Sequence, residues 1–240
     1  MRRLLYAFAS TFVYRFLTGL TRLVVSLMAR WEVEGVGNVP RTGPVVLACN
    51  HLHLLDPPLV AASSPRQVHP MAKRELFETP LVGWALWPYG AFPVRRFSAD
   101  MGALRAARSL LRRGEVVMMF PEGTRSKDAI LHPALPGAAM VALLADSPIV
   151  PVAITGTEVV RLPRDMAGWL FGRRPRLRVV FGEPFHLPRG TAEARHAEVC
   201  TDLIMRHIAA LLPEEYRGAY GPESEGKVVF ARQEREQDGR

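Results

Sequence analysis

The chain has 240 residues, of which 48% are hydrophobic and 22% charged, a composition that is typical of a globular protein and excludes a disordered one. Its formal net charge of +8 comes mostly from arginine, because the sequence contains only the lysines Lys73, Lys127 and Lys227. Arginine forms bidentate contacts with phosphate, so phosphorylated substrates, lipid head groups and nucleic acid all remain open as partners. Cys49 and Cys200 are too few for a disulfide framework and favour a reducing compartment.

Residues 1–30 are predicted to form a helix, because large apolar side chains recur at spacings of three and four residues and arginines interrupt the run. No stretch of 18 uncharged apolar residues occurs, so we do not expect a simple membrane-spanning helix. A signal peptide also fits poorly, because few apolar residues precede the small-residue site at 7–9. We predict a basic amphipathic helix that lies in a membrane interface. The alternative is a helix docked on the protein's own core.

Short apolar runs alternate with helical patterns along the rest of the chain. Strands are predicted at 31–36, 45–49, 68–72, 90–96, 115–120, 149–154 and 176–181, and helices at 56–62, 98–113, 138–145 and 191–212. This alternation predicts the α/β class, with a single mixed, mostly parallel sheet flanked by helices. We therefore divide the chain into the N-terminal membrane-associating helix at 1–30, one domain at 31–215 and a polar, disordered tail at 216–240.

Residues 45–58 carry a candidate catalytic pair. Asp56 precedes Pro57, so we expect Asp56 to be the N-cap of the following helix. His51 and Asp56 are about 140° apart on a helix, so one helical face cannot carry both, whereas a strand-to-helix loop can bring them together. Asp56 would then orient His51 as a general base for a hydroxyl that the substrate supplies, since no nucleophile lies beside the pair. The alternative is a surface histidine beside a helix cap, because so short a motif also arises by chance.

Charged residues also follow the predicted strand at 115–120. Gly123 permits a sharp turn, while Glu122 and Arg125 project charge from the end of the strand. Open α/β sheets hold their ligands at the carboxyl ends of their strands, so we expect these residues to contact a ligand. Two other short strands end in basic residues, which are Lys73, Arg95 and Arg96.

Two competing motifs lead to other functions. His51, His53 and Asp56 resemble the front of a metal-hydrolase signature, although the last spacing is three residues rather than two and Pro57 follows. A metal-dependent hydrolase therefore remains an alternative. The arginines of the predicted helix at 98–113 lack interleaved aromatic residues, so we expect a solvated face and no nucleic-acid partner.

Taken together, four ordered blocks resemble the phospholipid and glycerolipid acyltransferase family, over about residues 30–185. The blocks are Asn50-His51 with Asp56, Gly90-Ala91-Phe92-Pro93-Val94-Arg95-Arg96, Phe120-Pro121-Glu122-Gly123-Thr124-Arg125-Ser126 and Val150-Pro151-Val152-Ala153. Lys73 also stands where the family usually has lysine. The chain departs from the family pattern at His53 and at Leu135-Pro136, where the family commonly has a basic residue shortly before Gly137. These departures leave the acceptor open among lysophosphatidate, glycerol 3-phosphate and other lyso-lipids.

The resemblance implies transfer of a fatty acyl group to the free hydroxyl of a lysophospholipid, with 1-acyl-sn-glycerol 3-phosphate as the expected acceptor and phosphatidate as the product. Acyl-CoA or acyl carrier protein would be the co-substrate, and no metal or bound cofactor is implied. His51 would be the general base and Asp56 its orienter. The acceptor site would contain Lys73, Arg95, Arg96, Glu122, Gly123, Thr124 and Arg125, with Arg125 as the phosphate anchor. The expected location is the cytoplasmic face of the cell membrane, and a non-catalytic protein that binds anionic lipids is a further alternative.

Overall fold

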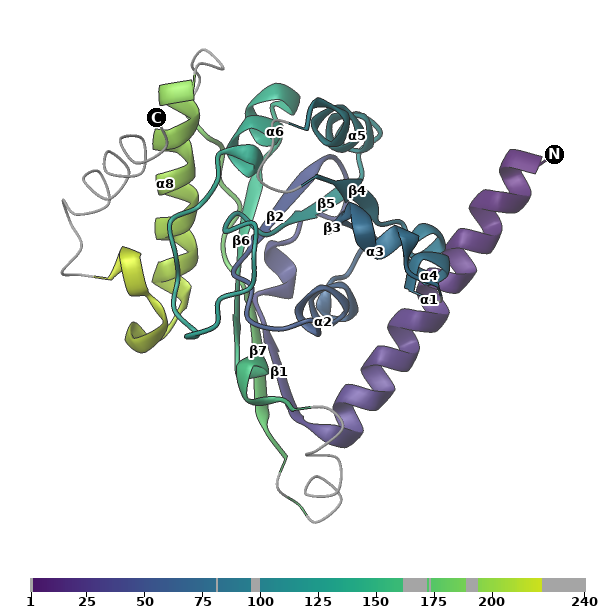
Figure 1. The fold of residues 1–240 in the computed structure, drawn as a ribbon, viewed down its shortest axis with the longest axis horizontal. Coiled ribbons are helices and arrows are strands. Elements are labelled where there is room, and N and C mark those ends of the chain that lie inside the picture. Colours follow the sequence, from purple (N-terminus) through teal and green to yellow (C-terminus); the bar gives the residue numbers. More distant parts are fainter. Residues whose placement is uncertain are drawn as a thin grey trace.

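The computed structural model describes residues 2–80, 82–95, 100–161, 172, 174–188 and 194–221, and Figure 1 shows helices on both faces of a twisted sheet. In this part of the chain the sheet has seven strands in the order β1-β7-β6-β2-β5-β3-β4. The strands are β1 Arg30–Glu34, β2 Val45–Cys49, β3 Val68–Lys73, β4 Phe92–Val94, β5 Val116–Met119, β6 Ile149–Thr155 and β7 Arg176–Phe181. Neighbouring strands are parallel except for the antiparallel pair of β6 and β7. The predicted mixed, mostly parallel sheet is confirmed.

The helices form two layers, and each covers one hydrophobic cluster. The helices are α1 Arg2–Met28, α2 Asp56–Ser63, α3 Arg74–Glu78, α4 Val82–Tyr89, α5 Met101–Arg112, α6 Gly137–Ala145 and α8 Ala194–Leu211. One cluster includes residues of α5, α6 and α8, and the other includes residues of α1, α2 and α4. β2 contributes alternate side chains to both clusters, and all five of its residues are buried. This burial explains why β2 is a continuous apolar run rather than an alternating one.

Two predicted helix starts differ from the structure. Asp56 is the first residue of α2 rather than its N-cap, which is Leu55. The carboxylate of Asp56 is turned back toward the preceding loop, so it does not cap the helix. α5 is capped by Asp100, whose Oδ1 accepts a hydrogen bond from the backbone N of Ala103 at 3.0 Å. Ser98, the first residue of the helix predicted at 98–113, lies outside the described residues.

One face of α1 is docked on the domain. Tyr14 is 6% exposed, and its hydroxyl accepts a hydrogen bond from the backbone N of Val68 at 3.1 Å. Its ring lies 5.0 Å from the ring of Tyr89 in α4. Further along the helix, the Nε of Arg22 donates to the carbonyl O of Ala62 in α2 at 2.7 Å. The alternative of a helix packed on the core therefore describes this face correctly.

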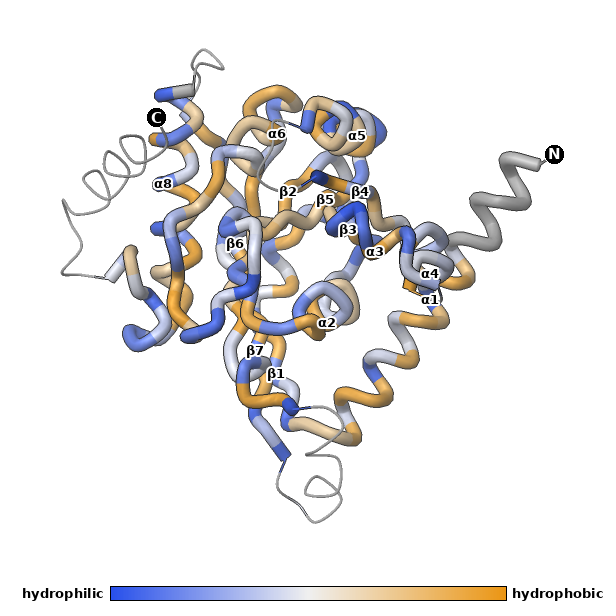
Figure 2. Tube along the Cα trace, in the orientation of Figure 1, coloured by the Kyte–Doolittle hydropathy of each residue, from blue (hydrophilic) through white to orange (hydrophobic). Residues whose placement is uncertain are grey.

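The other face of α1 is apolar and exposed. Figure 2 shows the hydrophobic residues of this helix in orange. Its exposed large side chains are Phe12, Phe16, Leu20, Leu23, Val24 and Leu27. Among the described residues, α1 is the one helix that is long and apolar enough to cross a membrane, through its segment Thr11–Met28. Because only 17% of that segment is buried in the protein, most of its surface is available to another apolar phase.

Gly218–Tyr220 form a short 3-10 helix that packs against the domain. The ring of Tyr220 is buried in the cluster under α5, α6 and α8. The backbone N of Ala219 donates to the carbonyl O of Leu131 at 3.1 Å. The rest of the predicted tail, 222–240, lies outside the described residues.

Candidate active site

Three parallel strands bring the candidate residues to one edge of the sheet. β2 lies between β5 and β6, and both neighbours are parallel to it. Their carboxyl ends therefore meet, and the loops that leave them can contact one another. The loop after β2 carries His51, the loop after β5 carries Glu122, and the turn after β6 carries Thr157.

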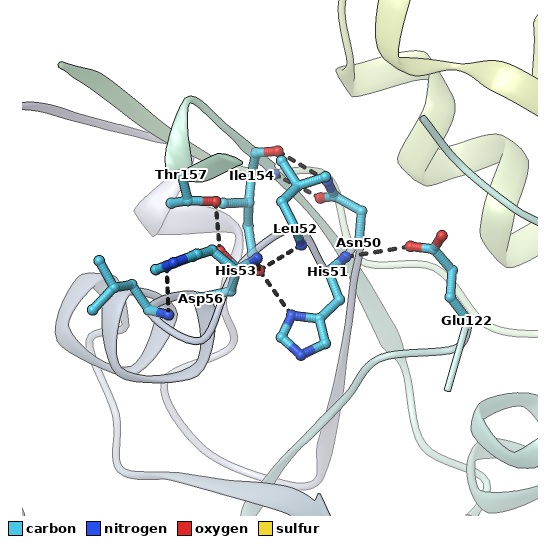
Figure 3. Close-up of polar contacts among 9 residues, drawn as sticks. Asn50, His51, Leu52, His53, Asp56, Glu122, Ile154 and Thr157 are labelled. Carbon is cyan, nitrogen blue, oxygen red and sulfur yellow. Dashed lines mark hydrogen bonds and ion pairs between the residues drawn. The ribbon is translucent and has the colours of Figure 1, made fainter. Parts of the chain in front are cut away.

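His51 and Asp56 form a buried pair, as predicted from their spacing (Figure 3). The Nδ1 of His51 lies 2.8 Å from the Oδ2 of Asp56, and their exposed fractions are 5% and 0%. A carboxylate only accepts hydrogen bonds, so Nδ1 carries the proton and the lone pair is on Nε2. The ring of His51 also stacks on Phe120, with 4.1 Å between the ring centroids. The arrangement presents an oriented imidazole that can accept a proton at Nε2.

The carboxylate of Asp56 is held by further donors. Its Oδ2 accepts hydrogen bonds from the backbone N of Leu52 at 2.6 Å and of His53 at 2.7 Å. Its Oδ1 accepts a hydrogen bond from the hydroxyl of Thr157 at 2.6 Å. These donors compensate for removing the charge from water and fix the direction in which Asp56 points.

Two long-range contacts of the site were not predicted: Asn50 ties the end of β2 to β6, and Thr157, in the turn after β6, reaches Asp56 in α2. The side chain of Asn50 accepts a hydrogen bond from the backbone N of Ile154 at 2.7 Å and donates to its carbonyl O at 2.9 Å. Thr157 supports Asp56 from 101 residues away in the chain. No local pattern links these positions, although the polar turn at 155–157 marks the end of a buried strand.

Cys49, two residues before His51, is not a nucleophile in this arrangement. It is completely buried, and burial together with the charge of Asp56 raises the pKa of its thiol. The thiol therefore stays protonated, whereas the thiolate is the reactive form. The hydroxyl of Ser126 in the neighbouring loop donates to Asp128 at 2.8 Å. Neither side chain therefore offers a nucleophile to His51 and Asp56, and this arrangement suits deprotonation of a hydroxyl that the substrate supplies.

Glu122 points into the protein. It is 5% exposed, and its Oε1 accepts a hydrogen bond from the backbone N of His51 at 3.3 Å. Its Oε2 accepts one from the backbone N of His132 at 3.0 Å. Burial raises the pKa of Glu122 to about 7, against the opposing effect of these two hydrogen bonds. Binding of the acceptor by Glu122 stays a prediction. The hydrogen bonds that Glu122 accepts from the backbone were not predicted from the sequence.

The residues after Glu122 form an exposed loop. Gly123 has a φ of 71°, and a Cβ at this position would lie 2.8 Å from the Cδ1 of Leu135, so a larger residue would not fit without movement. Thr124 and Arg125 are exposed. Arg125 is therefore accessible to a ligand that carries phosphate, on a loop whose flanking residues Glu122 and Ser126 bond to the backbone of His51.

The other predicted basic residues lie on the outer strands β3 and β4. The Nζ of Lys73, the last residue of β3, lies 3.4 Å from the Oε1 of Glu75. Arg95 follows β4, and its backbone N donates to the Oδ2 of Asp100 at 2.9 Å. Arg96 lies outside the described residues. The structure thus brings His51, Asp56 and Glu122 into direct contact, whereas Lys73 ends β3 and Arg95 follows β4, on the outer side of β5.

The metal-site hypothesis involves His53. Its Nδ1 accepts a hydrogen bond from the backbone N of Leu55 at 3.3 Å. Burial lowers the pKa of His53, and Arg125 and His51 lower it further, whereas Asp56 raises it. Within the described ranges, no group of three or more His, Cys, Asp and Glu residues is arranged to hold a metal ion. The metal alternative stays a hypothesis that substitution of His53 tests.

An apolar cavity of about 540 Å³ adjoins the site. Its walls come from β3, β4, α5, β5 and α6, and they include Met71, Val94, Leu104, Met119, Leu135 and Met140. Phe120 and Gly123 also line it, so the cavity reaches the residues beside His51. Its size is in the usual range for a small-molecule pocket. The cavity could not be predicted from the sequence, because its lining comes from five separate elements.

Comparison with known proteins gives one consistent family. The sequence profile of the family described as "Acyltransferase" matches residues 30–155. The chain is 30% identical over 175 residues to a 1-acyl-sn-glycerol-3-phosphate acyltransferase of Bacillus subtilis, a match that covers 72% of this chain and 83% of that protein. It is 31% identical over 159 residues to the chloroplastic 1-acyl-sn-glycerol-3-phosphate acyltransferase BAT2 of Brassica napus. That match covers 65% of this chain and 45% of the plant protein, so the chain spans less than half of that relative.

The fold agrees with this family. The crystal structure of the 1-acyl-sn-glycerophosphate (LPA) acyltransferase PlsC from Thermotoga maritima superimposes with a TM-score of 0.65 and 24% sequence identity. The superposition covers 84% of this chain and 80% of that structure. The profile matches more than half of this chain, and the residues it matches contain His51, Asp56 and Arg125. The chain therefore belongs to the acyltransferase family and is an acyltransferase enzyme.

Proposed function

We propose that the protein transfers a fatty acyl group from acyl-CoA or acyl carrier protein to the free hydroxyl of 1-acyl-sn-glycerol 3-phosphate. The observation that carries this proposal is the buried pair of His51 and Asp56, 2.8 Å apart, beside a loop that exposes the guanidinium of Arg125. The pair can deprotonate a hydroxyl, and the arginine can bind the phosphate of the same acceptor. The names of the Bacillus and Brassica relatives support the same acceptor.

The reaction follows from the free nitrogen of His51. Its Nε2 accepts the proton of the acceptor hydroxyl while the oxygen attacks the thioester carbonyl carbon. A C–O bond forms, and the C–S bond breaks when the tetrahedral intermediate collapses. The proton on Nε2 then passes to the departing thiolate, so the base returns to its starting state. Asp56 keeps Nδ1 protonated and stabilises the imidazolium that exists between the two proton transfers.

The apolar cavity suits the acyl chain of the donor or the acceptor. Its lining includes methionine, leucine and valine side chains and reaches Phe120, whose ring stacks on His51. Burial of an alkyl chain against such a lining contributes about 0.8 kcal/mol per CH₂ group. A chain held there would place its carbonyl carbon near Nε2, which is the arrangement that the transfer requires.

Arg125→Lys tests the phosphate anchor. Lysine keeps the charge but not the planar guanidinium fork, so it cannot bind phosphate through two parallel hydrogen bonds. We expect the acceptor KM to rise about 10-fold, which corresponds to the loss of one charge-assisted hydrogen bond, while the donor KM stays nearly unchanged. Initial rates measured against each substrate separately give both values. A rise in the donor KM alone would assign Arg125 to the phosphates of the donor and refute its role as the acceptor anchor.

The membrane is the proposed location, because the lipid acceptor resides in a bilayer. α1 packs against α4, where Trp84 is 79% exposed and Trp87 is 53% exposed. Tryptophan is favoured at the boundary between lipid and water. The docked face of α1 and the hydrogen bond from Arg22 to Ala62 favour a helix that lies in the interface over one that crosses the bilayer. The basic N-terminal segment favours the cytoplasmic leaflet.

Phe16→Glu combined with Leu23→Glu tests this surface. Both side chains are about 60% exposed on the outer face of α1 (60% and 58%), so their replacement spares the docked face. Each large apolar side chain contributes about 1.5–3 kcal/mol when it enters the membrane, so binding should weaken at least ~100-fold. Co-sedimentation with anionic vesicles measures this binding. Val199→Glu is the matched control, because Val199 is 63% exposed on α8 at the opposite side of the domain. Equal vesicle binding by the double variant and the control would contradict the proposed surface.

A further inference from the structure

The loop that carries Arg125 is attached to the backbone of His51 at two points. The backbone N of His51 donates to the Oε1 of Glu122 at 3.3 Å. The carbonyl O of His51 accepts a hydrogen bond from the backbone N of Ser126 at 2.7 Å. Both polar groups of His51's main chain are therefore bound by residues that lie on either side of Gly123, Thr124 and Arg125 in the sequence.

The second oxygen of Glu122 extends the connection to the far end of the same loop. Its Oε2 accepts a hydrogen bond from the backbone N of His132 at 3.0 Å. The side chains of Ser126 and His132 both contact Asp128, each at 2.8 Å from Oδ1. Residues 122–132 thus form a closed loop, and the carboxylate of Glu122 joins its two ends to the base.

We infer that Glu122 is a positioning residue, which holds the catalytic base His51 and the loop that carries Arg125 (residues 122–132) in one fixed arrangement and does not bind the acceptor. The inference rests on the proposed function, because it requires His51 to be the base and Arg125 to bind the phosphate. The hydroxyl and the phosphate belong to one acceptor molecule, so their separation is set by covalent bonds. A base displaced by about 1 Å from its productive position costs a large part of the rate. At 5% exposure, Glu122 offers the acceptor almost no accessible surface.

The ionisation of Glu122 makes this role measurable. Burial raises its pKa to about 7, the nearby Asp128 raises it too, and His132 lowers it, as do the two backbone hydrogen bonds. Only the carboxylate can accept from both backbone N–H groups with full strength, because protonation turns one of its oxygens into a donor. The attachment should therefore be complete above pH 7 and weaken as the pH falls through 7. Glutamine has one acceptor oxygen and one NH₂ group, so Glu122→Gln imitates the protonated form at every pH.

The kinetics of Glu122→Gln test the inference. At pH 8 we expect kcat to fall about 10- to 100-fold, the effect of losing one hydrogen bond to a charged group, with acceptor KM changed less than about twofold. The ratio of wild-type to variant kcat should decrease toward 1 as the pH is lowered from 8 to 6. A variant with unchanged kcat and a raised acceptor KM would overturn the inference, because it would make Glu122 an acceptor ligand. A ratio that is constant across this pH range would overturn it as well.

Two substitutions at His132 separate the backbone donor from the side chain. His132→Pro removes the N–H that donates to Glu122, whereas His132→Ala keeps it, and both lose the contact with Asp128. We expect the proline variant to lose kcat to a similar extent as Glu122→Gln and the alanine variant to stay within about threefold of wild type. Circular dichroism confirms that each variant is folded, and the result for Glu122→Gln decides the matter if the proline variant is not. Equal kcat in folded proline and alanine variants would contradict the inference.

His51→Ala, measured in the same assays, distinguishes a failure of the positioning role of Glu122 from a failure of the proposed function. If His51→Ala is inactive and Glu122→Gln changes only acceptor KM, the proposed function holds and the positioning role fails. If His51→Ala retains activity, the proposed function fails, and with it the arrangement that Glu122 was inferred to maintain.

Discussion

Purified His51→Ala should transfer acyl groups at least ~100-fold more slowly than the wild type, because it lacks the group that accepts the proton of the acceptor hydroxyl. The loss should appear in kcat, with little change in the KM of either substrate, since Arg125 and the cavity remain in place. The fold should survive, because among the described residues the ring of His51 hydrogen-bonds to Asp56, and the carboxylate keeps its contacts with Leu52, His53 and Thr157. Initial-rate kinetics and a thermal melt check both expectations.

His53→Ala is the matched control for this experiment. His53 is adjacent in the loop, and its backbone N–H, which holds Asp56, is kept in the variant. The acyl-transfer mechanism predicts activity within about threefold of wild type. Full activity in His51→Ala would refute the assignment of the base. An equally severe loss in both variants, together with bound metal in elemental analysis of the wild type, would support the metal-dependent alternative instead.

Asp56→Asn should be nearly as damaging to activity while leaving the fold intact. The amide oxygen can replace Oδ2 as acceptor for His51, Leu52 and His53, and the NH₂ group can donate to the hydroxyl of Thr157, which also accepts. The geometry can therefore persist, but the negative charge that stabilises the imidazolium is gone. In the serine-protease triad the corresponding change costs about 10⁴-fold, so we expect a loss of at least ~10²-fold here.

The control for Asp56→Asn is Thr157→Val, which removes one hydrogen bond to the carboxylate and leaves its charge. This variant should lose about 1–3 kcal/mol of stability, the cost of a buried acceptor with one partner fewer, and keep most of its activity. Melting temperatures and kcat values of the two variants give the comparison. If Thr157→Val and Asp56→Asn lose the same fraction of kcat, the charge of Asp56 has no special part in the reaction.

The parts of the structure that follow local rules could be predicted from the sequence. β2, β5 and β6 are buried apolar runs that end at polar or glycine-containing turns, and their helical connections imply a mostly parallel sheet. The pair of His51 and Asp56 is local as well, since both lie in the same strand-to-helix loop. The exposed loop with Arg125 follows directly from the end of β5.

The contacts that support this pair could not be predicted, because they join residues far apart in the chain. Thr157 reaches Asp56 across 101 residues, and His132 meets Glu122 only because the loop folds back on itself. The contacts of Glu122 are equally non-local, because its oxygens accept hydrogen bonds from main-chain N–H groups of two segments.

α4 was missed for a different reason. Pro88 lies inside it, and a proline normally interrupts a helical pattern. Its residues are also apolar on the exposed side, where a helix of a water-soluble domain would be polar. The outer face of α1 shares this feature, so residues 1–30 combine a face that packs on the domain with an exposed apolar face, and the membrane-interface helix stays a prediction.

The most direct test is mass spectrometry of the products formed from a mixed pool of acceptors. Purified wild-type protein receives lysophosphatidate, glycerol 3-phosphate and neutral and zwitterionic lyso-lipids in equal amounts. The donor is acyl-CoA in one series and acylated acyl carrier protein in another. We expect phosphatidate to be the main product of the wild type in at least one series, and to be absent with His51→Ala. Acylation of a different acceptor would contradict the proposed substrate, and phosphatidate formed equally by His51→Ala would contradict the catalytic base.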